Sequence, residues 1–458
     1  MNLTFGTDGW RGKIGDVFTD SNLSIVTQAT CDYLLSIDSN RFVAIGYDNR
    51  FRSEQYAQIV AEIFSSNGFE VLLSDEAVST PVVSYITNRF KTSLGICITA
   101  SHNPPEYNGY KIKENFGGSA LSSTIDQIIP FLGKTLPKNG DSRKITKIDF
   151  TAEYFVNLRQ MFDLQKIASH FKDTPVNLNY MHGSSSGYIG EVFKNIYLPT
   201  LEYNMDRNVL FGGFNPEPIP KNMKEFMSLI RSGLGFAFDG DGDRIAGVTS
   251  SGEYVNSSQL MAIAIPHLKR RSTASRCAFT VSCSDIAHRV ASKEGLQVVA
   301  TKIGFKHIAD LMISKPPVLI GGEESGGIGF INYLPERDGI ANALLIMEAL
   351  AFSGINLDVA ISSLEDKFGK LEQRRVDLHV TDPDDIKKSL KELAENPNAF
   401  LPTESVDTLD GVKLRLLDQS WIMFRLSGTE PLLRIYAESE SSVKTLELIE
   451  KGKKFLCR

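Results

Sequence analysis

The stretch FVAIGYDNRFRSEQYAQIVAEIFSSNGFEVLL, residues 42–73, decides the fold. Residues 42–47 are an apolar run typical of a buried strand, and residues 53–66 have the apolar spacing of a helix. An Asn67-Gly68 turn separates this helix from a second strand. The order strand, helix, strand implies a crossover connection and mainly parallel pairing, so this unit predicts an α/β fold.

The same order of elements recurs twice further along the chain. The second copy is VNLNYMHG, SSSGYIGEVFKNI and TLEYN within residues 176–204, and the third is CAFTVSC, SDIAHRVASKEG and LQVVAT at residues 277–301. Three such units at domain-sized spacing predict three related α/β domains. The alternative is that any long α/β protein contains repeated units of this kind.

The last ninety or so residues have a different pattern. A strand near residues 375–380 precedes the charged helix DPDDIKKSLKELAEN, three short strands follow (GVKLRLL, SWIMFRLS and LLRIYAES), and a terminal helix ends near Lys454. Consecutive strands with short turns predict an antiparallel sheet with helices on one face. We therefore expect a C-terminal α+β domain, with domain boundaries at 1–147, 148–250, 251–368 and 369–458.

Length and composition agree with this organisation. The chain has 458 residues, and about 150 residues per domain suggests three or four domains. Its net charge of −6 argues against a dedicated nucleic-acid binder. The five cysteines are scattered, the N-terminus lacks the pattern of a signal peptide, and the apolar runs are too short to span a bilayer. We expect a cytoplasmic protein that binds no membrane and no nucleic acid.

The first candidate for chemistry is TASHNPPEYNGYKIK, residues 99–113, called here the serine loop. Ser101 follows the apolar run LGICI, and the carboxyl ends of such strands carry ligand chemistry in α/β folds. The prolines and Asn108-Gly109 predict a stiff, turn-rich loop. A hydroxyl held there beside His102 and Lys111 could act as a nucleophile. The alternative is a rigid surface turn with an ordinary serine.

The second candidate is DGDGDR, residues 239–244, called here the acidic loop. Asp239, Asp241 and Asp243 alternate with glycines that let the loop curl, so the three carboxylates can converge. Three such oxygens suit a hard divalent cation such as Mg²⁺, which also leaves room for a phosphoryl oxygen. An EF-hand is excluded because the loop emerges from a strand. The alternative is a solvated acidic turn.

Three weaker candidates, to one of which a nearby lysine is added, complete the set. GGEESGG at residues 321–327, the glycine-rich loop, offers acceptors for sugar hydroxyls, although a turn with solvated acids is the common alternative. RLSGTEPLLR at residues 425–434, the basic loop, combines arginines, hydroxyls and backbone N–H groups into a possible anion cradle, or else is a tight hairpin with exposed arginines. Arg11 in FGTDGWRG and Lys306 in TKIGFKHI are further cationic candidates. Together the five segments form an inventory for phosphoryl transfer.

These segments strongly resemble the α-D-phosphohexomutase family, which includes phosphoglucomutases and phosphomannomutases. The resemblance covers essentially the whole chain, and the motifs stand in the family's order. It also includes YMHG at residues 180–183, FGGFNPEP at residues 211–218 and ERDGI at residues 336–340.

The resemblance implies a fold and a reaction. Three related mixed α/β domains and a C-terminal α+β domain similar to the TATA-binding protein would surround a central cleft. Ser101 would carry a phosphoryl group and would bind Mg²⁺ together with the three aspartates. The phosphoserine would donate to a sugar monophosphate, giving a hexose 1,6-bisphosphate that reorients and returns its other phosphate.

The resemblance also assigns roles to the remaining residues. Arg11, His102 and Lys111 match the basic catalytic residues around the transferred group. The substrate-binding residues would comprise those that read the sugar and those that hold the non-reacting phosphate: Arg244, Gly304, Lys306, Glu323, Ser325, Arg425, Ser427, Gly428, Thr429 and Arg434.

The sequence favours glucose phosphate as the substrate. GEESGG is typical of glucose-preferring branches, whereas glucosamine enzymes tend to have Gln at the position of Glu324 and Ile at the position of Trp10. We expect a phosphoglucomutase, a monomer or dimer, with Mg²⁺ and with glucose 1,6-bisphosphate as activator and intermediate. The alternatives are a phosphomannomutase or phosphoglucosamine mutase of the same mechanism, or a non-catalytic sugar-phosphate binding protein.

Overall fold

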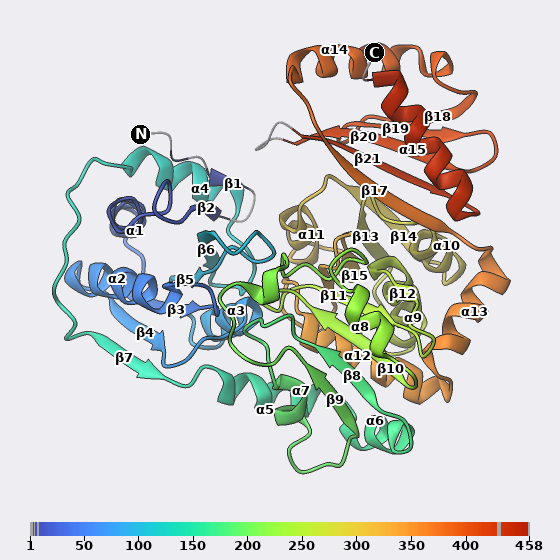
Figure 1. Ribbon diagram of the computed structural model, residues 1–458. Helices are drawn as coiled ribbons and strands as arrows, with labels where there is room; N and C mark the ends of the chain where they lie inside the picture. The colour runs from blue at the N-terminus through green and yellow to red at the C-terminus, as the bar shows by residue number, and fades with distance from the viewer. Residues whose placement is uncertain (1–2, 4, 7–8, 428–431, 457–458) are drawn as a thin grey trace.

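The computed structural model describes residues 3, 5–6, 9–427 and 432–456. Four β-sheets follow one another along the chain, each with its own helices (Figure 1). The first sheet, in blue to teal, lies at the left of this view, and the fourth, in red, lies at the top right above the third. The expected class, three mixed α/β domains and a C-terminal α+β domain, is confirmed.

The first sheet has seven strands in the order β1-β2-β6-β5-β3-β4-β7. Strands β3, β4, β5 and β7 are mutually parallel, while β6 runs antiparallel to β5 and β2. The elements are β1 (Phe5–Gly6), β2 (Gly9–Lys13), α1 (Asp20–Ser36), β3 (Phe42–Tyr47), α2 (Ser53–Ser66), β4 (Glu70–Ser74), α3 (Thr80–Arg89), β5 (Leu94–Ile98), β6 (Tyr107–Glu114), α4 (Ser122–Ile128) and β7 (Ile145–Ile148). The strand–helix–strand unit over residues 42–73 is thus confirmed.

The second and third sheets repeat the parallel unit. Strand β8 pairs in parallel with β9, and β13 pairs in parallel with β14. In each sheet an antiparallel partner is added next to the strand that carries a candidate loop, β11 beside β10 and β16 beside β15.

The elements of the second sheet are α5 (Thr151–Met161), α6 (Leu164–Phe171), β8 (Val176–Asn179), α7 (Tyr188–Val192), β9 (Thr200–Tyr203), α8 (Lys224–Leu229), β10 (Leu234–Phe238), β11 (Ile245–Val248) and β12 (Tyr254–Val255). The elements of the third are α9 (Ser257–Arg270), β13 (Arg276–Thr280), α10 (Asp285–Lys293), β14 (Gln297–Thr301), α11 (Phe305–Met312), β15 (Val318–Gly322), β16 (Ile328–Phe330), α12 (Gly339–Ser353) and α13 (Leu357–Phe368).

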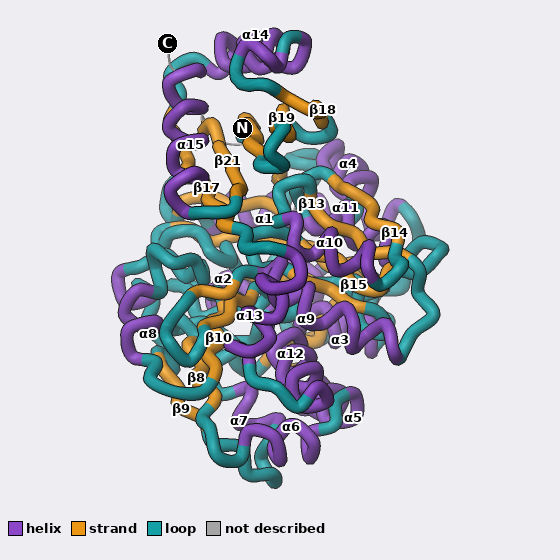
Figure 2. Tube along the Cα trace, turned by 90° about the vertical axis from the view of Figure 1, so that its right-hand side faces the viewer, coloured by secondary structure: helices purple, strands orange, loops and turns teal. Residues whose placement is uncertain are grey.

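The fourth sheet is wholly antiparallel, in the order β17-β21-β20-β19-β18. Its elements are β17 (Glu372–His379), α14 (Pro383–Glu395), β18 (Thr403–Asp407), β19 (Val412–Leu416), β20 (Trp421–Leu426), β21 (Leu432–Ser439) and α15 (Ser442–Leu456). Side chains of both α14 and α15 belong to the core cluster of this sheet, and Figure 2 shows the two helices beside it. Strand β18 was not predicted from the sequence.

One apolar core joins the first three sheets. It contains buried side chains from α3 and α5, from the second sheet, and from α9 and α12 of the third. Helix α12 is buried along nearly its whole length. Within the described residues no single helix is long and apolar enough to cross a membrane; α12 and α13 pass that test only as a pair bent by 78°.

Candidate active site

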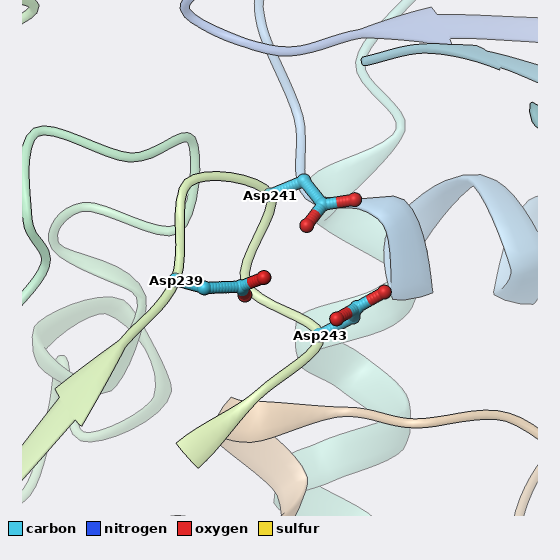
Figure 3. A group of neighbouring side chains, drawn as sticks. All are labelled: Asp239, Asp241 and Asp243. Atoms are coloured by element: carbon cyan, nitrogen blue, oxygen red, sulfur yellow. The ribbon is translucent and has the colours of Figure 1, made fainter. Parts of the chain in front are cut away.

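The acidic loop curls as its glycines predict. The three aspartate side chains are fully buried, and one oxygen from each lies within 4.8 Å of the others. Figure 3 shows the carboxylates of Asp239, Asp241 and Asp243 facing a common space from the turn that follows β10. Gly242 adopts a φ of +70°, a left-handed conformation that glycine tolerates, and this allows the reversal.

The hydrogen-bonding pattern of the three aspartates is consistent with a cation in that space. Asp241 Oδ1 and Asp243 Oδ1 are buried and, among the described residues, have no hydrogen-bond partner. A buried carboxylate oxygen without a partner costs free energy, and a bound cation removes that cost. Carboxylate oxygens are the ligands that Mg²⁺ prefers. The three aspartates therefore fit a magnesium site.

Ser101 lies directly against this triad. Its Oγ donates to Asp239 Oδ2 at 2.9 Å and lies 3.3 Å from His102 Nδ1. The residue is about 1% exposed and has a φ of +54°, an uncommon conformation for a serine. Thr99 Oγ1 accepts from the Ser101 N–H at 2.8 Å and supports this turn at the end of β5. The structure thus brings the serine and the acidic loop together.

The serine loop is held by an arginine that the sequence analysis did not single out. Arg50 is fully buried and donates to four backbone carbonyls of the loop, those of Ser101, Asn103, Pro104 and Tyr107, at 2.6–3.0 Å. A guanidinium can serve several carbonyls at once because its five N–H groups form a rigid fork. The sequence feature that could have pointed to Arg50 is its position just after the apolar strand β3.

Lys111 does not lie in a loop as predicted. It is on β6, which begins at Tyr107, because Tyr110 and Ile112 point into the core of the sheet and outweigh the turn signal of Asn108-Gly109. The Lys111 ammonium is buried and donates to Asp241 Oδ2 at 2.8 Å and to Asp243 Oδ2 at 3.1 Å. The pairing of β6 within the sheet, and not a stiff loop, therefore places the Lys111 ammonium beside Asp241 and Asp243.

Arg337 is a second cationic residue that was not among the predicted site residues, although ERDGI was noted as a stretch. Its Nη2 donates to Asp243 Oδ2 at 2.7 Å, and its Nη1 donates to Glu323 Oε2 at 3.4 Å. It therefore links the acidic loop to the glycine-rich loop. The backbone reinforces this link, since Ile245 N donates to Gly326 O at 3.0 Å.

Burial and charge set the protonation of the site. Burial, Asp243 and Asp241 together raise the pKa of Asp239 well above its ordinary value. Burial would also raise the pKa of Asp241, but Lys111, the hydrogen bond from Thr80 and the charge of Arg337 together outweigh it and hold that pKa below the ordinary value. Burial and the charges of Arg244 and Arg11 lower the pKa of His102, so its imidazole is neutral near pH 7. A neutral ring beside the Ser101 hydroxyl can accept or donate a proton.

Of the predicted sugar-binding residues, Gly304 contacts Glu323 directly. The Glu323 carboxylate is buried and accepts from Gly304 N at 3.1 Å, at the start of α11. Ser325 is half-buried on the same loop, and Arg244 pairs with Glu217 at 3.0 Å. Lys306 is on α11 and donates to Ser122 Oγ at 2.9 Å, so it connects the third sheet to the first.

The basic loop lies on the fourth sheet. Arg425 and Arg434 are directly paired across β20 and β21. Arg425 Nε donates to Asp410 Oδ2 at 3.0 Å, Arg434 Nε lies 3.9 Å from Asp377 Oδ2, and the loop closes through Ser427 N to Leu432 O at 2.8 Å. Gly428 and Thr429, which were also predicted to bind phosphate, lie outside the described residues.

Arg11 lies on β2 and faces the serine loop. Its Nη1 donates to Asn103 Oδ1 at 2.8 Å. Gly109, its partner across β2 and β6, has no room for a side chain: a Cβ there would lie 2.4 Å from Thr99 O. The first sheet therefore brings Arg11 close to the residues that follow Ser101.

Profiles of known families match nearly the whole chain. Four domain profiles of phosphoglucomutase/phosphomannomutase match in order: alpha/beta/alpha domain I at residues 2–161, domain II at 152–252, domain III at 256–368 and the C-terminal domain at 376–451. The pattern of the four sheets and the family's domain order therefore agree.

Individual proteins are similar over their full length. A phosphoglucomutase/phosphomannomutase of Thermococcus kodakarensis is 29% identical, with 100% of this chain and 99% of that protein covered. A phosphoglucosamine mutase of Caldanaerobacter subterraneus is 28% identical, with 98% and 97% covered. The solved structure of a Thermus thermophilus protein assigned as a phosphomannomutase superposes with a TM-score of 0.87, at 29% identity and 100% and 99% coverage.

Proposed function

The chain belongs to the phosphoglucomutase/phosphomannomutase family of α-D-phosphohexomutases, and from that premise we propose that it interconverts glucose 1-phosphate and glucose 6-phosphate. The reaction runs through a phosphoserine at Ser101 and through glucose 1,6-bisphosphate, which also serves as the activator. Each half of the cycle moves one phosphoryl group between the serine oxygen and a sugar hydroxyl.

The observation that carries this proposal is the contact between Ser101 Oγ and Asp239 Oδ2 at 2.9 Å. It sets a hydroxyl at the edge of a buried carboxylate triad whose converging oxygens suit a cation. Mg²⁺ held by Asp239, Asp241 and Asp243, and by the Ser101 phosphate, would neutralise charge on the transferred group.

The surrounding side chains support transfer in specific ways. Lys111 places positive charge against Asp241 of the triad, and Arg11 places it against Asn103 two residues after Ser101; phosphoryl transfer needs positive charge near the transferred group. His102 Nδ1 is 3.3 Å from Ser101 Oγ, within reach for holding a proton as the serine oxygen gains or loses its phosphate. The burial of Ser101 excludes water and so limits hydrolysis of the phosphoserine.

Two further groups would orient the sugar. Glu323 and Ser325 would accept hydrogen bonds from its hydroxyls, with Arg244, Gly304 and Lys306 around them. The non-reacting phosphate would bind to the basic loop through Arg425, Ser427, Gly428, Thr429 and Arg434. Because one phosphate site serves both the 1-phosphate and the 6-phosphate, the sugar has to bind in two orientations.

A second candidate is the same reaction on another hexose. The similar proteins include enzymes named for mannose and for glucosamine phosphates. Glu324 favours glucose over glucosamine because the glucosamine enzymes of the family tend to have Gln at this position. Its carboxylate accepts from the hydroxyls of Ser282 and, at 3.5 Å, Thr280. No described residue is assigned to the sugar O2, which distinguishes glucose from mannose.

A coupled assay that compares glucose 1-phosphate, mannose 1-phosphate and glucosamine 1-phosphate tests the substrate. We expect the highest kcat/KM with glucose 1-phosphate, and a higher value for either other sugar would refute the assignment. Intact-protein mass spectrometry after exposure to glucose 1,6-bisphosphate tests the covalent step. The wild type should gain one phosphoryl group and Ser101→Ala none.

A further inference from the structure

The acidic loop does not orient Asp241 by itself. Two donors from the first domain meet the same oxygen of this carboxylate: Lys111 Nζ lies 2.8 Å and Thr80 Oγ1 lies 2.5 Å from Asp241 Oδ2. The other oxygen, Oδ1, is buried and has no hydrogen-bond partner in the described part of the chain. Holding one oxygen on the side of the first sheet turns the second toward Asp239 and Asp243.

Thr80 is fixed at this place by the backbone. It is the first residue of α3, and Pro81 next to it favours a helix start there. The Thr80 N–H donates to the carbonyl of Asp241 at 2.9 Å, so the acidic loop itself accepts from the helix end. Thr80 thus donates hydrogen bonds to both the main chain and the side chain of Asp241.

Cys97 is the second hydrogen-bonding partner of the Thr80 hydroxyl. Its Sγ lies 3.4 Å from Thr80 Oγ1, and both residues are fully buried. The Thr80 hydroxyl has a single proton, and it uses this proton in the hydrogen bond to the Asp241 carboxylate. In the contact with Cys97 the thiol is therefore the donor and the hydroxyl oxygen is the acceptor. Burial raises the pKa of Cys97 to about 12, and the thiol therefore keeps its proton.

Two neighbouring strands of the first sheet supply Cys97 and Lys111. Cys97 on β5 and Lys111 on β6 are directly paired, so their side chains lie on one face of the first sheet. This face abuts the acidic loop, because both Lys111 and Thr80 reach Asp241 across it. The metal site of the second domain is thus completed by the first.

We propose that Thr80 is a positioning residue for the metal site, with Cys97 directing its hydroxyl, so that together they orient Asp241 Oδ1 toward the cation. Outer partners of metal ligands typically change metal affinity by about 10–100-fold. This inference rests on the proposed metal site and adds to it the residues that set its affinity.

Mn²⁺ titration followed by electron paramagnetic resonance, on the full-length dephosphorylated protein, tests the proposal. We expect Thr80→Val to weaken Mn²⁺ binding by about 10-fold or more. Thr80→Ser keeps the hydroxyl and should bind within about twofold of the wild type. Cys97→Ala should weaken binding by a few-fold, less than Thr80→Val, since only the direction of the hydroxyl is lost.

Thr87→Val is the matched control. Thr87 lies on the same helix, is equally buried, and donates only to the carbonyl of Val83 within that helix. It should bind Mn²⁺ as the wild type does, and its thermal unfolding measures what a buried threonine hydroxyl contributes to stability alone.

Two results separate the inference from the proposed site. If Asp241→Asn abolishes Mn²⁺ binding while Thr80→Val binds as tightly as the wild type, the positioning role is wrong and the metal site stands. If the wild type binds no Mn²⁺, the metal site itself is wrong and the inference falls with it. Equal weakening by Thr80→Val and Thr80→Ser would also overturn the role of the hydroxyl.

Discussion

At the scale of single residues, the site depends on buried charges that each serve several partners. Arg50 binds four carbonyls and pairs with Asp48 at 3.3 Å, and its guanidinium lies 4.9 Å from the ring of Phe211 on the second domain. Burial lowers the pKa of Arg50, although guanidinium groups remain charged in proteins. One side chain therefore fixes the serine loop and also touches the neighbouring domain.

We predict that Arg50→Lys slows phosphoryl transfer from the enzyme by about 10–100-fold, because a displacement of the reacting group by about 1 Å has an effect of this size. Lysine has no planar fork, so it cannot bind the four carbonyls together. Lost hydrogen bonds to a charged group should lower the free energy of unfolding by about 2–4 kcal/mol. Single-turnover kinetics and urea unfolding measure the two effects.

Arg52→Lys is the matched control for this change. Arg52 is two residues away and pairs with Asp20 at the surface, where both side chains are more than a third exposed. Its substitution should change stability by no more than about 0.5 kcal/mol and leave the transfer rate unaltered. A similar loss of rate in both variants would contradict the role given to Arg50.

At the scale of elements, most strands and helices follow from the sequence. Helix α2 was predicted over residues 53–66, which are its observed bounds, because its apolar spacing and the Asn67-Gly68 turn agree. Strand β6 was mistaken for a loop, since turn-forming Asn108 and Gly109 lie inside it. Strand β18 was missed because its residues alternate only weakly and it pairs at the edge of the sheet.

The turn of the acidic loop provides a test at this scale. A Cβ on Gly242 would lie 2.9 Å from Ser185 Cβ and 3.0 Å from Ser79 Cβ. We predict that Gly242→Ala lowers the free energy of unfolding by about 2–5 kcal/mol, through left-handed strain of about 1–2 kcal/mol and overpacking of about 1–3 kcal/mol. Chemical denaturation measures this loss, and metal affinity should fall with it.

Gly213→Ala separates strain from packing. Gly213 has a φ of +85°, but a Cβ there would meet nothing within 4 Å. Its substitution should cost only the strain of about 1–2 kcal/mol. If the two variants lose equal stability, the close packing of Gly242 between two serines has no energetic consequence.

At the scale of the whole molecule, the site exists only because domains touch. Its groups come from loops and strands far apart in the sequence, and a sequence pattern records which residue ends a strand but not which domain faces it. The serine and the triad were therefore predictable as strand-end chemistry. The contacts of Arg50, Thr80 and Arg337 were not, because each depends on how segments distant in the sequence come together.

The junction of the third and fourth domains should respond to acid. Arg415 donates to both oxygens of Asp285 at 2.6 and 2.9 Å, and although burial opposes it, this pairing lowers the pKa of Asp285. Because the pKa of Asp285 is lower in the folded protein than in the unfolded chain, its ion pair stabilises the fold fully above about pH 4, the unfolded pKa. This stabilisation is lost as the pH falls through the lower pKa of the folded protein. We predict that the stability advantage of the wild type over Asp285→Asn falls progressively as the pH drops below about pH 4.

Tryptophan fluorescence during urea unfolding, at a series of pH values, measures this advantage. The chain has two tryptophans, and Trp421 is buried at this junction against Val281, so a Trp10→Phe background isolates its signal. Glu438 beside Asp285 has a pKa raised by burial, an effect of opposite sign that the difference between the two proteins largely removes. An advantage that stays constant from pH 6 to pH 3 would contradict the prediction.

The central claim is that the phosphoryl group passes through Ser101 in every turnover. Its most direct test mixes enzyme carrying a radiolabelled phosphoryl group on Ser101 with unlabelled glucose 1-phosphate and Mg²⁺, and quenches within one turnover. We predict that the label leaves the protein and appears in glucose 1,6-bisphosphate or glucose 6-phosphate. If glucose 6-phosphate forms while the label stays on the protein, the account is wrong.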